Sequence, residues 1–149
     1  MALEKQIQED LKAAMFAKDA TALASIRGIK AAIMLAKTAA GASDELTDAD
    51  IIKIIQKLVK QRKESAAIYA EQSRPELAEA ELAEAAIMEK YLPVQLSEEE
   101  VEEAIKKIIA QVGAQSPADM GKVMGVATKA LAGQADGRLI STIVKRLLS

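Results

Sequence analysis

The sequence predicts an all-α protein, with an N-terminal four-helix part followed by a small C-terminal three-helix part. Half of its 149 residues are apolar, but only one is Phe, two are Tyr and none is Trp. Ala and Leu, which supply much of the apolar content, are strong helix formers. Apolar residues recur every three or four positions, and no strand-like alternation persists. A break marked by Pro93 separates the two parts.

Four helices are predicted before this break. We expect the first over about residues 3–18 and the second after Asp19, ending before Gly41. Thr47 is a favourable N-cap for the third helix, whose Ile-rich start predicts contact with more than one neighbour. The fourth helix follows Ser73. Its less regular pattern predicts five buried positions, which are Leu77, Leu82, Ala85, Ala86 and Met88.

The expected domains are residues 1–92 and 97–149. Ser97 and Glu100 have the spacing of a capping box, in which each residue's side chain accepts a hydrogen bond from the other's backbone. They predict a helix that runs from residue 98 to about Val112. This is the clearest helix start in the chain.

Two more helices complete the predicted C-terminal domain. Ser116 and Pro117 are interpreted as the N-cap and the first residue of one helix, which ends near Gly133. Asp136 is the expected N-cap of the last helix.

The chain contains neither Cys nor His. This composition excludes thiol nucleophiles, disulfides, Ser–His–Asp chemistry and the usual zinc ligands. No GxxxxGK[ST] loop and no GxGxxG motif occurs. Acidic residues between Glu76 and Glu103 could in principle hold a hard cation, but their regular spacing is typical of solvated helix faces. We therefore expect no catalytic residue, no metal site and no cofactor.

No apolar run of about 18 residues lacks charge, so we expect no membrane span and no membrane partner. The first residues mix acids and bases, unlike a secretory signal. The lack of Cys is compatible with a reducing compartment, and we expect a cytoplasmic location.

Charge is distributed unevenly. Residues 113–149 hold five basic and two acidic side chains, whereas residues 42–112 hold nine and sixteen. Two basic rows at helical spacing occur in the N-terminal part, which are Arg27, Lys30 and Lys37, and Lys53, Lys57 and Lys60 with Arg62 and Lys63 just beyond. Such rows can follow nucleic-acid phosphates, but ordinary exposed lysines paired with nearby acids are the simpler interpretation.

Gly121 and Gly125 flank Lys122 within one predicted helix. Each glycine costs about 1 kcal/mol of helix stability relative to Ala. Close packing between helices would explain them. Approach of a partner's backbone, with Lys122 supplying charge, would explain them equally well.

A second candidate segment runs through the loop before the last helix. Gly137 and Arg138 lie at a helix N-terminus, where backbone N–H groups and the helix dipole favour anions. Lys145 follows about two turns later on a similar face. Turn and capping roles for Gly133 and Asp136 remain the stronger single explanation of this loop.

Five ordered motifs resemble those of YqeY-type GatB/YqeY-domain proteins. They are Arg27–Ala32, Lys60–Ser65, Glu89–Ser97, Met120–Met124 and Gly133–Leu139. Each alone is weak, but five at these spacings are specific and cover essentially the whole chain. The resemblance implies an all-α fold with a helical N-terminal part and a three-helix C-terminal part.

The resemblance also implies a functional context. The same helical region occurs as the tail of the B subunit of the tRNA-dependent amidotransferase, which converts Glu or Asp misacylated on tRNA to Gln or Asn with ammonia from glutamine. There the tail helps to hold the tRNA, while a larger domain activates the carboxylate with ATP and magnesium. By position, the resemblance implies a tRNA-facing role near Lys122, Gly133, Gly137, Arg138 and Lys145. It carries over no catalytic residue.

We therefore expect a non-catalytic module that binds tRNA or serves a tRNA amidotransferase or another tRNA-handling protein. The family label of carbon–nitrogen ligase with glutamine as amido-N-donor fits the parent complex better, because no segment here is long enough to be the activating domain. The alternative is a helical protein-interaction adaptor with no nucleic-acid role. The acidic middle section and the pI of about 5.4 favour that alternative, since dedicated RNA-binding proteins are usually more basic.

Overall fold

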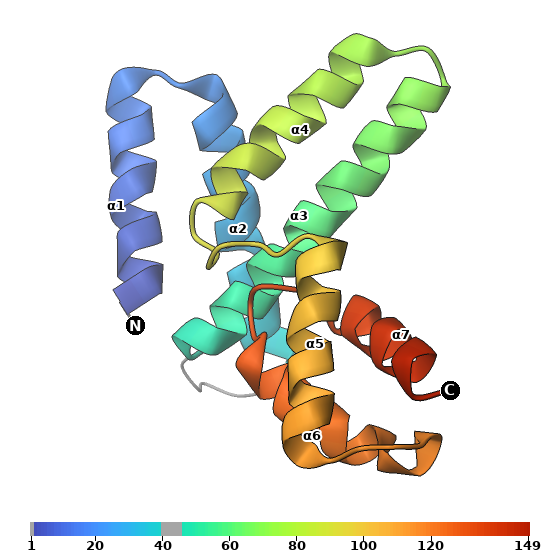
Figure 1. Ribbon diagram of the computed structural model, residues 1–149. Helices are drawn as coiled ribbons and strands as arrows, with labels where there is room; N and C mark the ends of the chain where they lie inside the picture. The colour runs from blue at the N-terminus through green and yellow to red at the C-terminus, as the bar shows by residue number, and fades with distance from the viewer. Residues whose placement is uncertain (1, 40–45) are drawn as a thin grey trace. The chain divides into compact units, whose positions relative to one another are not determined.

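The computed structural model describes residues 2–39 and 46–149, and every regular element in these ranges is helical (Figure 1). The elements are α1 (Ala2–Ala17), α2 (Ala20–Ala39), α3 (Asp48–Glu71), α4 (Pro75–Glu89), α5 (Glu98–Val112), the short 3-10 helix η1 (Pro117–Asp119), α6 (Met120–Ala130) and α7 (Gly137–Leu148). The predicted all-α class is confirmed. The predicted end of the second helix before Gly41 lies outside the described residues. None of these helices is long and apolar enough to cross a membrane.

The chain divides into two compact units, Met1–Leu92 and Pro93–Ser149. The N-terminal unit contains α1 to α4, and the C-terminal unit contains α5, η1, α6 and α7. Each unit has its own hydrophobic core. That the units behave as separate domains stays a prediction.

The core of the N-terminal unit draws on all four helices. Thr47 and Asp50 form a capping box that starts α3, and α3 then turns back into α4 as a long hairpin (Figure 1). The central side chains are each no more than 1% exposed, and they are Ile7, Ile29, Ile51, Ile55 and Met88. The Ile-rich start of α3 packs in this core, as its breadth predicted.

The buried face of α4 differs from the prediction. Ala85 and Met88 are buried, but the other three predicted positions, Leu77, Leu82 and Ala86, are exposed. Ala78 is buried in their place. The small side chains of Ala78 and Ala85 let α4 approach its neighbours closely, which leaves the larger leucines at the edge of the contact.

The C-terminal unit is a three-helix arrangement around a core that is fully buried at Val101, Ile105, Val123, Ile143 and Val144. The capping box predicted at the start of α5 is confirmed. The backbone N–H of Glu100 donates to Ser97 Oγ at 3.1 Å, and that of Ser97 donates to Glu100 Oε1 at 3.0 Å. Gly113 ends α5 in the left-handed conformation, with a φ of 69°.

The predicted start of the following helix at Pro117 is wrong. Ser116 makes no side-chain capping bond, and residues Pro117–Asp119 form a separate 3-10 turn before α6 begins. The Asp119 carboxylate accepts a hydrogen bond from the backbone N–H of Gln115 at 2.9 Å. This local bond competes with a regular helix start, as Asp side chains commonly do.

Candidate nucleic-acid interface

Charge is segregated among the helices of the C-terminal unit. The five acidic residues of α5 are Glu98, Glu99, Glu100, Glu102 and Glu103. In contrast, α6 and α7 contain no acidic residue, and their basic residues are Lys122, Lys129, Arg138, Lys145 and Arg146. Arg146 Nη2 pairs with Glu102 Oε1 of α5 at 3.1 Å. Among the described residues, no ion pair engages Lys122, Arg138 or Lys145.

Arg138 and Lys145 lie on the exposed side of α7. Ile140, Ile143 and Val144 of the same helix face the core, and a separation of seven residues places Arg138 and Lys145 on one stripe opposite them. The two side chains are about 10 Å apart along the axis, at 1.5 Å per residue. This stripe could reach successive phosphate groups.

The N-terminus of α7 is already capped from within the chain. The Asp136 side chain accepts a hydrogen bond from the backbone N–H of Arg138 at 3.4 Å. Gly137, in the first turn, is exposed, and an added Cβ there would meet open space. The capping carboxylate reduces the attraction of this helix end for an anion, so the charge available at this end comes from the Arg138 side chain.

Gly133 has a role in the fold. Its φ of 78° lies in the left-handed region, where Cβ-bearing residues are strained. Its carbonyl accepts a hydrogen bond from Gln95 Nε2 at 2.6 Å, and the next carbonyl, that of Gln134, accepts one from Leu96 N at 2.9 Å. Gly133 therefore shapes the loop between α6 and α7 and anchors the segment that precedes α5.

Gly121 and Gly125 are exposed on α6, next to the exposed Lys122. A Cβ added at either glycine would find no atom within 4 Å. Close packing against another helix, one of the two explanations considered for these glycines, is therefore not found among the described residues. The small side chains leave a low, open surface beside Lys122.

The basic row of α2 is partly used to hold α1. Lys37 Nζ lies 2.6 Å from Glu4 Oε1, and Lys30 Nζ donates a hydrogen bond to Gln8 Oε1. Arg27 is exposed. Two of the three cations in this row thus point toward the neighbouring helix.

The basic row of α3 is shorter than the sequence suggested. Lys53, Lys57 and Lys60 are exposed on the outer side of the helix. The expected continuation at Arg62 and Lys63 is wrong, because both turn toward α4. The pairs are Arg62 Nε with Glu81 Oε2 and Arg62 Nη2 with Glu84 Oε1, each at 3.8 Å, and Lys63 Nζ with Glu89 Oε1 at 2.5 Å.

Arg62 also connects two of the five sequence motifs. An added Cβ at Gly28 would lie 3.4 Å from Arg62 Nη2 and 3.7 Å from Met88 Cε. Glycine at this position leaves room for the guanidinium, which α4 holds from the other side. The contact was missed from the sequence because it depends on how α2 crosses the α3–α4 hairpin.

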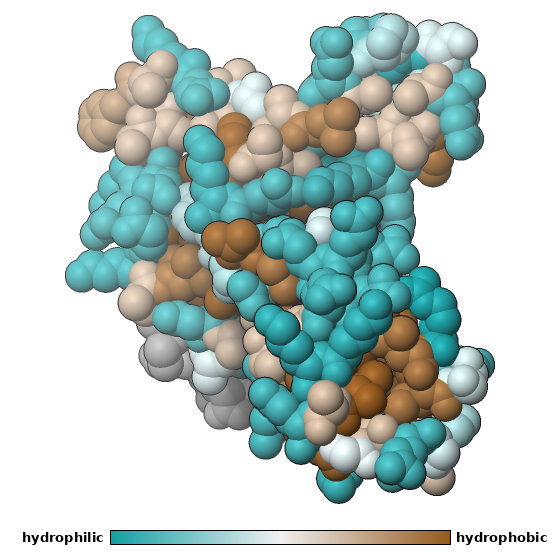
Figure 2. Space-filling model, in the orientation of Figure 1, coloured by the Kyte–Doolittle hydropathy of each residue, from teal (hydrophilic) through white to brown (hydrophobic). Residues whose placement is uncertain are grey.

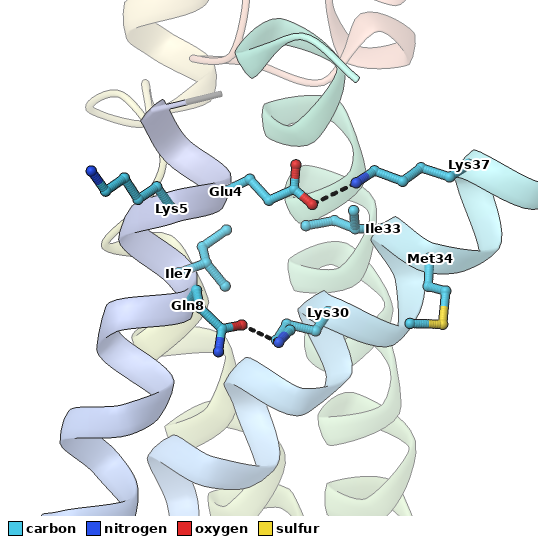
Figure 3. Close-up of a pocket in the computed structure, with 8 residues that line it drawn as sticks. All are labelled: Glu4, Lys5, Ile7, Gln8, Lys30, Ile33, Met34 and Lys37. Atoms are coloured by element: carbon cyan, nitrogen blue, oxygen red, sulfur yellow. Dashed lines mark hydrogen bonds and ion pairs between the residues drawn. The ribbon is translucent and has the colours of Figure 1, made fainter. Parts of the chain in front are cut away.

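The nine predicted site residues divide between the two units. Lys122, Gly133, Gly137, Arg138 and Lys145 belong to the C-terminal unit, and Arg27, Lys30, Lys57 and Lys60 belong to the N-terminal unit. Sequence reasoning also missed a groove of about 480 Å³ between α1 and α2, into which Lys30 and Lys37 point (Figure 3). Its apolar lining becomes visible only when the two helices are paired.

The displaced pKa values in the described chain have structural causes. The capping hydrogen bond from the Thr47 backbone lowers the pKa of Asp50, and that from the Ser97 backbone lowers the pKa of Glu100. Burial, followed by a hydrogen bond to Asp10, raises the pKa of Tyr91. In the same part of the chain, no three carboxylates lie close enough to hold a metal ion.

Comparison with known proteins places this arrangement. The family model described as Yqey-like protein matches residues 4–148. "Altered inheritance of mitochondria protein 41, mitochondrial" of Meyerozyma guilliermondii is 36% identical over 124 residues, which are 80% of this chain and 64% of that protein. The protein of the same name from Pyrenophora tritici-repentis is 30% identical over 147 residues, covering 96% of this chain and 79% of the relative. A glutamyl-tRNA(Gln) amidotransferase subunit of Thermococcus gammatolerans is 43% identical over 76 residues, which are 48% of this chain and 11% of that protein.

Two facts limit what these relatives transfer. The chain spans 60% to 66% of the length of three of the fungal relatives. The expectation of a cytoplasmic location is contradicted, because the fungal relatives are named as mitochondrial proteins. That expectation rested on the lack of Cys, which is compatible with any reducing compartment and selects none.

Proposed function

This chain belongs to the YqeY-like protein family, and on that premise we propose that it is a non-catalytic module that binds tRNA, alone or as an accessory part of a tRNA-amidotransferase-related assembly. The observation that carries the proposal is the charge of α6 and α7, which hold five cations and no acid. The segment shared with an amidotransferase protein suggests tRNA as the polyanion.

The chemistry of the two helices favours contact with phosphates and RNA shape. Lys122, Arg138 and Lys145 are exposed, and each can donate to phosphate oxygens. Residues 93–149 contain no Phe, Tyr or Trp, so stacking on unpaired bases is not available there. The open surface at Gly121 and Gly125 would let an RNA backbone approach Lys122 closely.

The amidotransferase reaction itself is not part of the proposal. The chain lacks the His and Cys residues that commonly serve as bases and nucleophiles, and it has no glycine-rich nucleotide loop. A carbon–nitrogen ligase activity found with this protein would therefore be supplied by a partner. The module would contribute the position of the tRNA.

Fluorescence anisotropy with labelled bulk tRNA tests the proposal. Arg138→Ala, Lys145→Ala and Lys122→Ala should each weaken binding several-fold and lower the slope of log K against log salt by about one. Lys107→Ala is the matched control, because Lys107 is an exposed lysine of the same unit on the acidic α5. No binding at low salt, or equal loss in Lys107→Ala, would overturn the proposal.

A protein-interaction adaptor is the second candidate, and exposed apolar side chains on the α3–α4 hairpin favour it. Ile68 is 53% exposed and Leu82 is 48% exposed. Figure 2 shows apolar surface on this hairpin among hydrophilic residues. A pull-down from native lysate with and without RNase separates the two candidates. Recovery of a partner that resists RNase and is lost with Leu82→Asp, but persists with Arg138→Ala, would favour the adaptor.

A further inference from the structure

The groove between α1 and α2 lies apart from the charged helices α6 and α7. Ile7 of α1 and Ile33 of α2 form its apolar floor and are 1% and 4% exposed. Met34 lines the α2 side and is 66% exposed. Figure 3 shows the two isoleucines between two polar contacts that join the helices, Glu4 to Lys37 and Gln8 to Lys30.

The two polar contacts differ in charge. Lys37 faces the Glu4 carboxylate, so its positive charge is compensated. Lys30 donates to Gln8, whose neutral amide leaves the ammonium charge uncompensated. Lys5 adds a third exposed ammonium group at the rim. An apolar floor edged by three ammonium groups and one carboxylate is complementary to a molecule with an apolar body and a single negative charge.

The size of the groove favours a small molecule over a protein segment. Its lining extends from Glu4 to Gln8 on α1 and from Lys30 to Lys37 on α2. At 1.5 Å per residue these stretches are about 6 and 10 Å long. A helix docked in a groove uses anchors over two turns or more, whereas about 480 Å³ lies within the usual range of small-molecule sites.

We propose that the α1–α2 groove binds a small amphipathic monoanion, such as a carboxylate with a short unbranched alkyl chain. The anionic head accepts a hydrogen bond from Lys30 Nζ in place of the Gln8 amide, which is exposed and can return to water. The alkyl chain covers Ile7 and Ile33 and contacts Met34. The Glu4–Lys37 ion pair closes the other end of the floor.

Decanoate is the probe, measured with the full chain by isothermal titration calorimetry and by chemical-shift changes of Ile and Met methyl groups. About 0.3 kcal/mol per non-hydrogen atom gives a Kd of about 1 mM for a ligand of this size. The Ile7, Ile33 and Met34 methyl signals should shift during the titration. Decylammonium, with the same chain and the opposite charge, should bind at least tenfold more weakly.

Two matched pairs of variants locate the site. Met34→Asp should abolish decanoate binding, whereas Leu35→Asp should preserve it, because Leu35 is the next residue of α2, is similarly exposed at 69% and does not line the groove. Lys30→Glu should weaken binding at least tenfold, whereas Lys57→Glu on α3 should leave it unchanged. The exposed positions 34 and 35 tolerate polar substitution, and circular dichroism confirms that each variant is folded.

Three results would overturn the proposal. They are the absence of a calorimetric signal and of methyl shifts with decanoate, equal loss of binding in Met34→Asp and Leu35→Asp, and equal binding of decylammonium. The tRNA measurement uses residues of the C-terminal unit, so either result can fail without affecting the other.

Discussion

The hydroxyl of Tyr91 donates a hydrogen bond to Asp10 Oδ2 at 2.5 Å, across 81 positions of the sequence. Tyr91 follows α4 directly, and Asp10 lies in the middle of α1. The bond therefore fastens the first helix of the N-terminal unit to the segment at which that unit ends.

Tyr91→Phe should lower the free energy of unfolding by about 1 kcal/mol, the usual net contribution of a hydrogen bond with a partly buried acceptor. Urea denaturation followed by circular dichroism measures this change. Tyr69→Phe is the control, because Tyr69 is half-buried in α3 and its hydroxyl has no hydrogen bond among the described residues. Equal stability of the Tyr91→Phe variant and the parent would show that the bond contributes nothing.

The same bond predicts a dependence on alkaline pH. Burial and the hydrogen bond to Asp10 raise the pKa of Tyr91 above its ordinary value of 10.0. The unfolded chain loses this proton first, so the stabilisation is full below pH 10 and falls as pH rises toward the folded pKa. The stability difference between the parent and Tyr91→Phe should therefore shrink above pH 10. Urea denaturation series at pH 8 and at pH 11 measure it, and a constant difference would contradict the shift.

Ser97→Ala should destabilise the protein by about 1 kcal/mol, because it removes the side-chain half of the capping box that starts α5. Ser116→Ala provides the comparison, since Ser116 precedes η1 and makes no side-chain capping bond. Thermal unfolding should separate the two variants by several degrees. Equal melting temperatures would mean that the box does not stabilise the unit.

Gly125→Ala should act in opposite directions on stability and on tRNA binding. The added methyl group meets open space, so the variant gains up to about 1 kcal/mol of helix stability. If an RNA backbone approaches this face, the same methyl group weakens tRNA binding. Gln111→Ala, an exposed change on α5, should leave binding unaltered. Unfolding and anisotropy are measured on the same preparations, and unchanged tRNA affinity would exclude a close approach at Gly125.

Gly133→Ala should cost about 1–2 kcal/mol, because its φ of 78° is unfavourable for a residue with a Cβ. Gly137→Ala should be tolerated, since its Cβ would meet nothing within 4 Å. Any loss of tRNA binding in Gly133→Ala should then follow its loss of structure. Anisotropy repeated at a temperature where the variant is fully folded distinguishes the two effects, and a persisting loss would indicate direct contact.

Local signals in the sequence predicted much of the fold. Ser97 and Glu100 predicted the start of α5, and Thr47 predicted that of α3, because a cap depends on residues three positions apart. Pro117 misled, because the nearby Asp119 carboxylate bonds the backbone of Gln115 and a 3-10 turn forms first.

Properties that depend on packing were harder to predict. Leu82 is more apolar than Ala78, yet Ala78 is buried, because its small side chain lets α4 pack closely. Arg62 fitted an exposed basic row by spacing, but the α3–α4 hairpin brings Glu81 and Glu84 to it. The α1–α2 groove was not predicted at all, since each helix contributes only part of its lining.

The two hydrogen bonds from Gln95 and Leu96 to the loop at Gly133 and Gln134 define what a transferable segment must include. A fragment that began at Glu98 would keep α5, α6 and α7 but lose both bonds and the Ser97 cap. A fragment that begins at Pro93 retains all of them. A gene fusion that joins this three-helix unit to a larger enzyme therefore has its natural junction before residue 93, and the four residues that follow Pro93 are inherited with the helices.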